Sequence, residues 1–581
     1  MYVSASRTLC AALVVALATV PGALAQTESQ AQTGSHKHYE HSDLASQAGP
    51  GGVLAPRLQN LGSHSFPVTT QNRDAQLYIN QGLNLAYAFN HAEARRAFKE
   101  AARLDPSLAI AYWGQALVLG PNINAMMETN EEPNALEDVR KAQSLKGTAS
   151  PREQALIDAL SKRYTGDPAH RQVNDKAYAT AMRDVHRRFP EDLDIAMLYV
   201  ESMMDLRPWG YWMRDGQPHE GTAEIVAITE EVMKRNPKHP GALHMYIHLM
   251  EANHAQKAEQ AADALVPLMP AAGHMVHMPG HIYQRVGRYA DAIRANELAV
   301  AADEDYITQC RAQGLYPMGY YPHNIHFLWF AATYDGQSAK AIDAAKKVAA
   351  KIDDEALKTV PITAGFRVVP YLALTRFGKW DEMLKQPEPP AASAYLRGMW
   401  HYNRGVALVA KNQLPAAEQE LTKLRAVLTD KSLDGTLFSP NISRNILEIG
   451  PEVLAGELAA ARKQYDVAIA HLEKAVRLED GLVYTEPSEW HYPPRHALGA
   501  ILLEAGRAAE AETVYWEDLR RNRENGWALF GLTQALRAQN KNAEAELIEA
   551  RFQKAWARAD VTLTGSRFGR VPGAAVTSDQ R

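Results

Sequence analysis

The stretch that decides the fold runs from residue 273 to residue 299 and reads GHMVHMPGHIYQRVGRYADAIRANELA. Its small residues fall at Gly280, Ala292 and Ala299, on either side of a break at Gly287. Small side chains at this spacing let two helices approach closely, and a glycine between the two runs indicates a turn. The stretch therefore predicts a helical hairpin.

The same spacing returns along the chain with a period of about 34 residues or somewhat more. It is clear in Tyr78, Gly82, Leu85, Ala94, Phe98, Ala101 and Pro106. Repeat starts are predicted near Ala75, His239, Gly273, Pro322, Ala364, Gly398, Ile449, Tyr492 and Glu524. One match would be weak, but so many in phase predict an array of hairpins over most of residues 75–555.

This pattern resembles the tetratricopeptide repeat (TPR) family. The resemblance implies an all-α superhelix of about 9–11 hairpins, whose first helices line a concave groove that holds a ligand or partner. The chain also resembles a group of bacterial TPR proteins through residues 90–94 (NHAEA) and residues 113–124, a similarity that implies no activity. Residues 107–238 match the repeat poorly, and we predict degenerate repeats there, with aromatic wedges or functional loops such as residues 206–212.

The two ends of the chain differ in character from the repeats. The first 25 residues are typical of a secretory signal peptide, with one charge at Arg7, an apolar run and a cleavage pattern ending at Ala25. We therefore expect a periplasmic or secreted protein without a membrane span. The boundaries we expect are a signal peptide at 1–25, a flexible His/Gln/Ser-rich lead-in at 26–70, helical repeats at 71–238, 239–350 and 351–560, and a disordered tail at 561–581.

Composition excludes several classes of function. The formal net charge is −5, with no basic patch for nucleic acid. Loss of Cys10 with the signal peptide leaves Cys310 alone, which rules out internal disulfides, thiolate metal clusters and covalent c-type haem. No nucleotide-binding loop, H-E-x-x-H or G-x-S-x-G motif is present. Whether the protein is an enzyme stays open.

Histidine is unevenly distributed, and this is the strongest functional signal in the sequence. Nine of the 21 histidines lie between residues 239 and 326. In the repeat that starts at Gly273, three of them take positions 2, 5 and 9, on the face opposite the buried one. In the repeat that starts at Pro322, two take positions 2 and 5, which predicts the same face. The repeat that starts at His239 leaves two registers open, both of which put an i, i+4, i+7 stripe on one face.

These histidines predict a transition-metal site on the wall of the groove. Neighbouring first helices stack about 10 Å apart, so matching positions converge. Imidazole pairs at i, i+3 or i, i+4 can share one ion, and imidazole ligation favours Zn, Cu, Ni or Fe over Ca or Mg. The predicted ligands are His244, His248, His274, His277, His281, His323 and His326.

Four other residues are predicted to support the site or bind a ligand. Glu251 continues the stripe of His244 and His248 and could complete a metal site or orient a histidine from behind. Tyr283, Arg495 and His496 are candidates for contact with a bound molecule, and Arg495 suits a carboxylate.

Two alternatives to a metal site remain open at this point. In the first, the array is a metal-free scaffold for a peptide, a small molecule or an exported protein, and the histidines act as hydrogen-bond donors with a pH dependence near 6.5. In the second, the array has only a structural role in envelope assembly. If a metal is present, it serves either ligand binding or metal-dependent catalysis.

Overall fold

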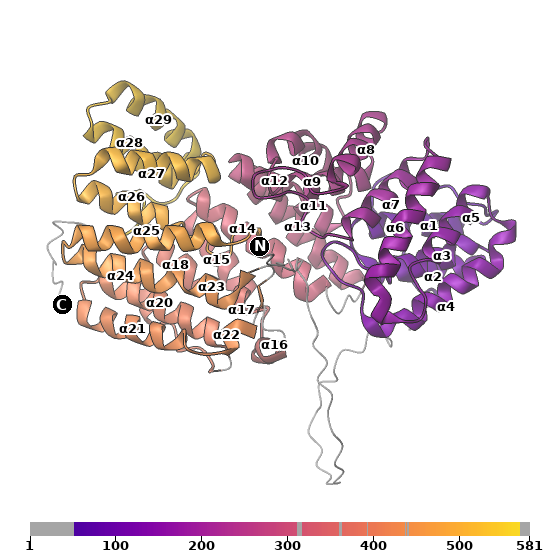
Figure 1. Ribbon diagram of the computed structural model, residues 1–581, viewed down its shortest axis with the longest axis horizontal. Helices are drawn as coiled ribbons and strands as arrows, with labels where there is room; N and C mark the ends of the chain where they lie inside the picture. Colours follow the sequence, from indigo (N-terminus) through magenta and orange to yellow (C-terminus); the bar gives the residue numbers. More distant parts are fainter. Residues whose placement is uncertain are drawn as a thin grey trace, which may run out of the picture. The chain divides into compact units, whose positions relative to one another are not determined.

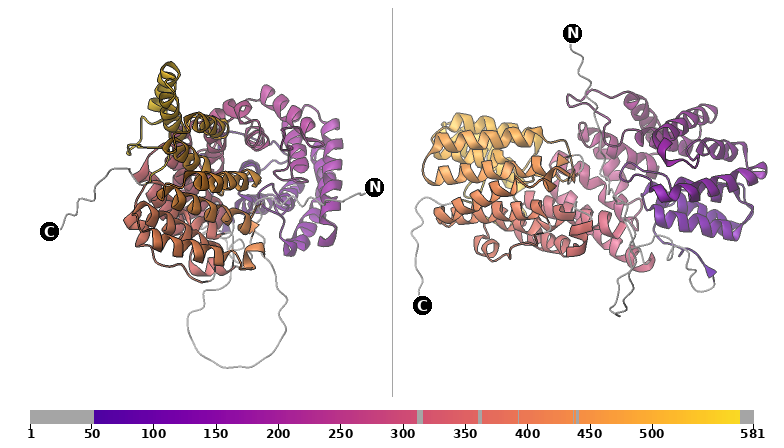
Figure 2. Two further views of the ribbon diagram at one scale, coloured as in Figure 1. Left: turned by 60° about the vertical axis from the view of Figure 1, so that its left-hand side comes forward. Right: turned by 60° about the horizontal axis from the view of Figure 1, so that its bottom comes forward.

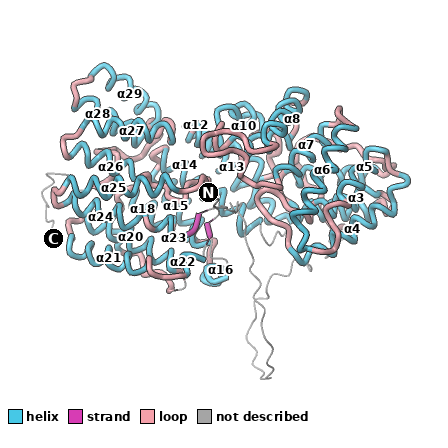
Figure 3. The backbone as a smooth tube through the Cα atoms, viewed as in Figure 1, coloured by secondary structure: helices cyan, strands magenta, loops and turns pink. Residues whose placement is uncertain are grey.

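The computed structural model describes residues 52–310, 316–359, 363–391, 393–435, 437–438 and 441–569. Within these ranges the chain is mostly helical (Figure 3), and its only strands are the antiparallel pair β1 (Leu437–Phe438) and β2 (Asn441–Ile442). The predicted all-α fold class is confirmed. None of the described helices is long and apolar enough to cross a bilayer. The predicted signal peptide and the first half of the lead-in lie outside the described residues.

The chain forms two compact units and passes between them more than once. The first unit takes in the chain up to Leu249 together with Ala264–Val276 and Ala301–Tyr321. The second unit takes in Met250–Asp263, His277–Val300 and the chain from Pro322 onward. All the crossings fall within the histidine-rich window that the sequence singles out.

The N-terminal part of the first unit consists of four helix pairs (Figure 1). They are α1 (Arg73–Tyr87) with α2 (His91–Leu104), α3 (Ala109–Leu117) with α4 (Glu132–Leu145), α5 (Pro151–Leu160) with α6 (Arg171–Arg188), and α7 (Leu193–Met204) with α8 (Thr222–Arg235). Short 3-10 turns η2 (Thr129–Glu131), η3 (Lys146–Thr148) and η4 (Pro168–His170) lie between them. Residues 107–238, predicted as degenerate repeats, thus hold three complete pairs.

The histidine-rich window contains shorter helices. In chain order they are α9 (Pro240–Met250), η5 (Ala255–Ala258), α10 (Glu259–Leu265), α11 (Gly273–His277), α12 (Pro279–Val286), α13 (Tyr289–Cys310), the π-helical turn η6 (Tyr316–Tyr320) and α14 (Tyr321–Tyr334). Pro279 divides the first helix of its repeat into α11 and α12, because proline has no N–H to donate and crowds the preceding turn.

The rest of the second unit continues as paired helices. They are α15 (Ser338–Ala349), α16 (Asp354–Thr359), α17 (Ala364–Arg367), α18 (Val369–Arg376), α19 (Trp380–Leu384), α20 (Ala394–Ala410), α21 (Leu414–Val427), α22 (Ser432–Gly435), α23 (Ser443–Leu447), α24 (Ile449–Ala461), α25 (Tyr465–Gly481), α26 (Pro494–Glu504), α27 (Ala508–Arg521), α28 (Gly526–Ala538) and α29 (Asn542–Ala555). Helices α20, α21, α24 and α25 lie side by side in both Figure 1 and Figure 2.

Each predicted repeat start lies within four residues of the beginning of a first helix, from α1 to α28. In the described residues, the pairs α3–α8 and the hairpins at the nine predicted starts make about twelve hairpins, close to the expected 9–11. The three pairs of α3–α8 are the degenerate repeats predicted for residues 107–238.

The small residues of the repeat do what the spacing requires. A side chain at Gly82 of α1 would come within 2.7 Å of the Phe98 ring on α2, and one at Gly456 of α24 within 2.8 Å of Leu472 on α25. Only glycine allows this approach at these two positions.

The helices also begin as their sequences dictate: the Asn72 side chain caps α1, and Ser150 and Glu153 form a reciprocal capping box at the start of α5.

Two segments expected to be flexible are ordered by contacts with the helices. The second half of the lead-in, residues 52–70, has no regular structure, yet the Phe66 side chain is 1% exposed and its N–H donates to Asn80 at 2.9 Å. At the other end, Arg567 pairs with Glu457 of α24 at 2.7 Å, and the Ser566 hydroxyl donates to the carbonyl of His496. Buried side chains and ion pairs outweigh the polar composition on which the expectation rested.

Candidate metal centres

The structure divides the predicted histidine stripe into two groups of three. Triad A consists of His244 and His248 on α9 and His274 on α11, and it lies in the first unit. Triad B consists of His277 at the end of α11, His281 on α12 and His323 on α14, and it lies in the second unit. Within each triad one nitrogen from every ring lies within 4.8 Å of the other two.

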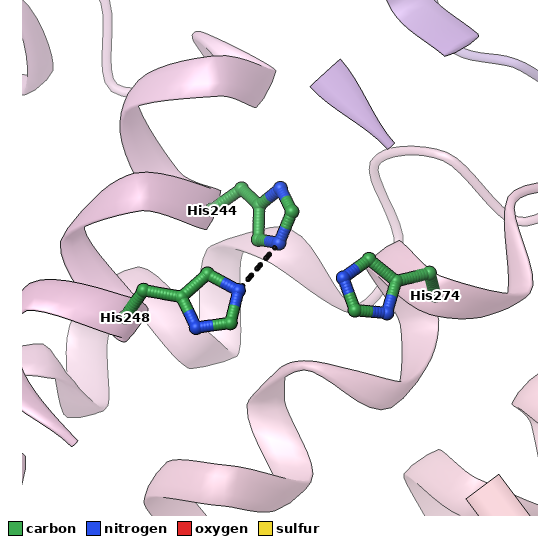
Figure 4. Close-up of side chains that lie close together, drawn as sticks. All are labelled: His244, His248 and His274. Atoms are coloured by element: carbon green, nitrogen blue, oxygen red, sulfur yellow. Dashed lines mark hydrogen bonds between the residues drawn. The ribbon is translucent and has the colours of Figure 1, made fainter. Parts of the chain in front are cut away.

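In triad A two imidazoles face each other across one turn of helix (Figure 4). The Nε2 atoms of His244 and His248 are 3.0 Å apart. His274 faces this pair from a different helix, with its ring centroid 4.9 Å from that of His244 and 6.2 Å from that of His248. All three side chains are buried, with exposures of 0–2%.

The tautomer of His244 is set by the backbone. Its Nδ1 lies 2.6 Å from the carbonyl oxygen of Tyr87, at the end of α1. A carbonyl can only accept, so the proton of His244 sits on Nδ1 and the lone pair of Nε2 points toward His248 and His274. A histidine whose Nδ1–H is held in this way presents Nε2 as a metal ligand.

An aromatic shell encloses triad A. The ring of Phe89, in the turn after α1, lies against all three imidazoles, with centroid distances of 4.6, 5.9 and 5.4 Å to His244, His248 and His274. Its backbone φ is +57°, a left-handed conformation that costs a bulky residue free energy. Trp209 packs edge-on against His248, and Tyr320 packs edge-on against His274.

A buried carboxylate supports the segment that holds His244. Asp194 of α7 accepts a hydrogen bond from the Tyr87 hydroxyl at 2.8 Å and contacts His64 and His239 at 2.8 and 3.3 Å. Burial alone would raise the pKa of Asp194, but its contacts with the two histidines hold that pKa well below the usual range. The anion therefore fixes Tyr87, whose carbonyl in turn orients His244.

Triad B repeats the arrangement of triad A. The Nε2 atoms of His277 and His281 are 2.8 Å apart, and the ring of His323 lies 4.9 and 5.7 Å from theirs. Phe327, one turn after His323, takes the place that Phe89 has in triad A, with its ring 4.4–4.9 Å from each imidazole. Each triad is thus three imidazoles around one phenylalanine.

The outer nitrogens of triad B also have acceptors. His277 donates from Nδ1 to the amide oxygen of Asn296 on α13 at 2.7 Å. That amide cannot be reversed, because its nitrogen donates to the carbonyl of Ala292 at 2.8 Å. The Nδ1 of His281 lies 2.7 Å from Glu251 and 2.7 Å from Glu486. Glu251 thus lies behind His281, on the side away from the other two imidazoles of triad B.

These carboxylates change the protonation of His281. Burial alone would lower the pKa of His281, but the charges of Glu251 and Glu486 outweigh burial and raise it to about 9. Burial and the charge of Glu251 raise the pKa of Glu486 to about 7. At neutral pH His281 therefore carries two protons and donates from Nε2 to His277, so a metal ion bound at this Nε2 would displace its proton.

The geometry of both triads suits a small transition-metal ion. Two imidazole nitrogens bound to one tetrahedral ion at about 2.0–2.1 Å are roughly 3.3 Å apart. The observed separations of 3.0 and 2.8 Å are a few tenths of an ångström shorter, which is a difference that small ring rotations can supply. Three histidines leave one position for water or another small ligand.

Several predicted residues lie outside the triads. The ring of His326 stacks on Trp329 at 5.2 Å and lies edge-on to Phe366, and it belongs to neither triad. Tyr283 donates to Asp263 at 2.8 Å. The predicted groove role is not supported for either residue.

The two predicted residues on α26 also have structural roles. Arg495 pairs with Glu479 and Asp480, and is 5% exposed, so it is not available to a carboxylate ligand. His496 accepts from Arg376 through Nδ1 at 2.9 Å and donates from Nε2 to Asp518 at 2.9 Å. Cys310 is buried, and burial raises the pKa of its thiol, as expected of a packed residue.

The prediction that the histidines line an open groove needs correction. The side chains of His244, His248, His274, His277 and His281 are 0–3% exposed. The register argument assigned one buried face to each first helix, but residues 241–250 of α9 are buried on every side. Their lack of any Asp, Glu, Lys or Arg already indicated this, since a helix apolar all round is a core helix.

Sequence reasoning missed the residues that orient and enclose the imidazoles. They are Phe89, Asp194, Asn296, Phe327 and Glu486. A usable signal existed for Asn296, which follows His277 by 19 residues; the same interval separates His401 from Glu420, whose side chains are 2.6 Å apart. The interval reflects two facing positions on the helices of one hairpin.

The helix pairs and the close contacts of Gly82 and Gly456 are those that the repeat requires. The chain has the tetratricopeptide-type fold. No family model matches this TPR-type chain, and no curated protein matches it. Its similarity to solved structures is remote.

Three solved structures illustrate the similarity of this TPR-type chain. A human IFIT1 dimer with m7Gppp-AAAA is 13% identical over 77% of this chain and 90% of its own, with a TM-score of 0.30. Cut9 in the APC/C hetero-tetramer Cut9–Hcn1 is 13% identical over 84% and 78%, also at 0.30. Yeast Tom70 is 12% identical over 83% and 93%, at 0.24. TM-scores of this size carry no argument about function.

Proposed function

We propose that this TPR-type scaffold is an exported protein that binds first-row transition-metal ions at triads A and B. One observation carries the proposal. In each triad an i, i+4 pair turns its Nε2 atoms together, at 3.0 and 2.8 Å, while the outer Nδ1 of at least one ring is held by an oxygen acceptor. This combination of convergent inner nitrogens and oriented outer nitrogens is typical of metal-binding histidines.

The ligand set favours zinc and copper. Neutral imidazole suits Zn, Cu, Ni and Fe, and three ligands with one open position suit ions that accept four-coordination. The aromatic shells of Phe89 and Phe327 limit access, so the fourth ligand has to be small. Binding and transfer of the ion, or activation of a small molecule on it, are the uses that this enclosure permits.

Burial favours this proposal over the metal-free alternative. A peptide held by histidine donors needs those donors on an accessible surface, and the imidazoles of triad A are 0–2% exposed. The scaffold can still bind a protein or other ligand through other surfaces, as helical-repeat arrays commonly do. Such binding would not depend on the triads.

The test is the metal content of tag-free protein loaded with zinc and then desalted. We expect at least one ion per triad, one fewer ion after His248→Ala, and one fewer after His277→Ala. His401→Ala is the matched control, because His401 is also buried and pairs with a carboxylate at 2.6 Å but belongs to neither triad. Protein that takes up no zinc at micromolar concentrations, or equal zinc in all variants, would overturn the proposal.

A further inference from the structure

His281 differs from the other histidines of the triads in what its outer nitrogen faces. The Nδ1 of His244 meets a backbone carbonyl and that of His277 meets an amide, both neutral acceptors. The Nδ1 of His281 meets two carboxylates, Glu251 and Glu486, each at 2.7 Å. Its Nε2 meanwhile faces the centre of triad B. One imidazole therefore separates a nitrogen-rich cluster from an oxygen-rich cluster.

The carboxylate side holds more acceptors than the imidazole can satisfy. One Nδ1 carries at most one proton, so it can donate to only one of the two oxygens at 2.7 Å. The Glu486 side chain is 3% exposed, and neither of its oxygens accepts a hydrogen bond of good geometry from any residue in the described ranges. The nearest other cation is Arg285, whose Nε lies 3.9 Å from Glu486 Oε1.

Two buried carboxylates converge here on one imidazole, which can neutralise only one of them. Like charges repel strongly at this separation in a low-dielectric interior, and a buried acceptor without a donor adds a further cost. The three ligand atoms, one from Glu251, one from Glu486 and the Nδ1 of His281, lie within 4.8 Å of one another. Two carboxylates also supply the charge that a divalent ion needs for burial.

We propose that Glu251, Glu486 and the Nδ1 of His281 form a second site for a divalent transition-metal ion, and that His281 bridges it to the ion in triad B as an imidazolate. The inference rests on the proposed function, because the bridge requires an ion in triad B. Occupancy of both sites displaces the Nδ1 and Nε2 protons of His281 to solvent, and no electrons move. The mixed oxygen and nitrogen ligands suit Zn, Cu, Mn or Fe in the divalent state.

Copper(II) provides a direct readout of the bridge. Two copper ions on opposite sides of one imidazolate lie about 6 Å apart, given metal–nitrogen bonds of about 2.0–2.1 Å. Their unpaired electrons couple through the ring, so the pair contributes no ordinary copper EPR signal. In full-length protein saturated with copper(II), we expect the total copper content to exceed the EPR-visible copper by two ions per chain.

Glu486→Gln removes a ligand of the second site and leaves triad B intact. Glu251→Gln is a second variant for the same purpose, should the first fold poorly. Each is expected to lose one copper per chain while the ion left in triad B regains its EPR signal. Glu420→Gln, which alters the carboxylate beside His401, is the matched control and should change neither value.

Each other outcome has a distinct meaning. A single copper in the second unit that is fully visible by EPR and unchanged by Glu486→Gln would overturn the bridge and leave the proposed function standing. If the unmodified full-length protein takes up no copper, or none that is lost after His277→Ala, the proposed function itself is overturned. Two coppers that both remain EPR-visible would overturn the bridging role of His281.

Discussion

Asn296→Ala tests whether the outer contacts of the triads matter for metal binding. The Asn296 amide oxygen accepts from His277 Nδ1 at 2.7 Å, and the side chain is fully buried. Once His277 binds a cation, this hydrogen bond becomes charge-assisted and contributes about 1.5–3 kcal/mol. Its loss should weaken zinc binding at triad B by roughly 10- to 100-fold.

The chain offers a closely matched control in Asn403. Asn403 is also fully buried in the middle of a helix, and its amide donates to the carbonyl four residues earlier at 2.8 Å, as Asn296 does. It contacts no triad. Asn403→Ala should therefore lower the free energy of unfolding by a similar amount, about 1–3 kcal/mol, without changing zinc affinity.

The assay is competition for zinc against a chromophoric chelator, in a His248→Ala background that removes triad A. Unfolding in urea provides the free energy of unfolding of each metal-free variant. An Asn296→Ala protein that is destabilised but binds zinc within twofold of its parent would refute the idea that Asn296 orients His277. Equal loss of zinc affinity in both asparagine variants would mean that general destabilisation is the cause.

Four further predictions follow from other contacts. Phe89→Leu should weaken zinc binding at triad A about tenfold and leave triad B unchanged, because the Phe89 ring packs on all three imidazoles of triad A. Equal effects on both triads in the chelator assay would contradict this. Burial lowers the pKa of His326 to about 3. Below about pH 6.5 this imidazole is therefore protonated in the unfolded chain but stays neutral in the folded chain. The free energy of unfolding should then fall as the pH drops from 6.5, by up to about 1.4 kcal/mol per pH unit, and urea unfolding of His326→Phe should show a shallower slope. Asp518→Ala leaves Arg376 and His496 without their buried anion. It should lower the free energy of unfolding, measured in urea, by about 3–5 kcal/mol and leave the zinc content unchanged. A loss of zinc would contradict the purely structural role of Asp518. The N-terminal sequence of protein recovered from its natural source should begin at Gln26, and an uncleaved Met1 would refute the signal peptide.

The hairpins could be predicted because their determinants are local. Gly82 and Phe98 belong to the two helices of one hairpin, so their contact repeats with the period of the sequence. The three hairpins of residues 107–238 were predicted only as degenerate repeats, because that stretch matches the repeat spacing poorly. The fold class was right.

The candidate site could be predicted only in part. The pairs His244/His248 and His277/His281 are separated by one helical turn, so their proximity follows from helix geometry alone. The division of the histidines into two triads depends on how separate helices pack together, and the spacing of the histidines along each helix does not predict that packing. Glu486 lies 205 residues after His281 in a loop, and no local pattern connects them.

The most direct test of the central claim is zinc K-edge X-ray absorption on the tag-free, zinc-loaded protein with triad B and the adjoining carboxylate site both removed by His281→Ala. Triad A then predicts three imidazole rings per zinc at about 2.0–2.1 Å, identified by outer-shell scattering from the ring carbons. The same spectrum should disappear together with the bound zinc after a further His248→Ala change. Zinc bound without imidazole scattering, or bound equally after His248 is replaced, would contradict the claim that buried histidine triads hold the metal.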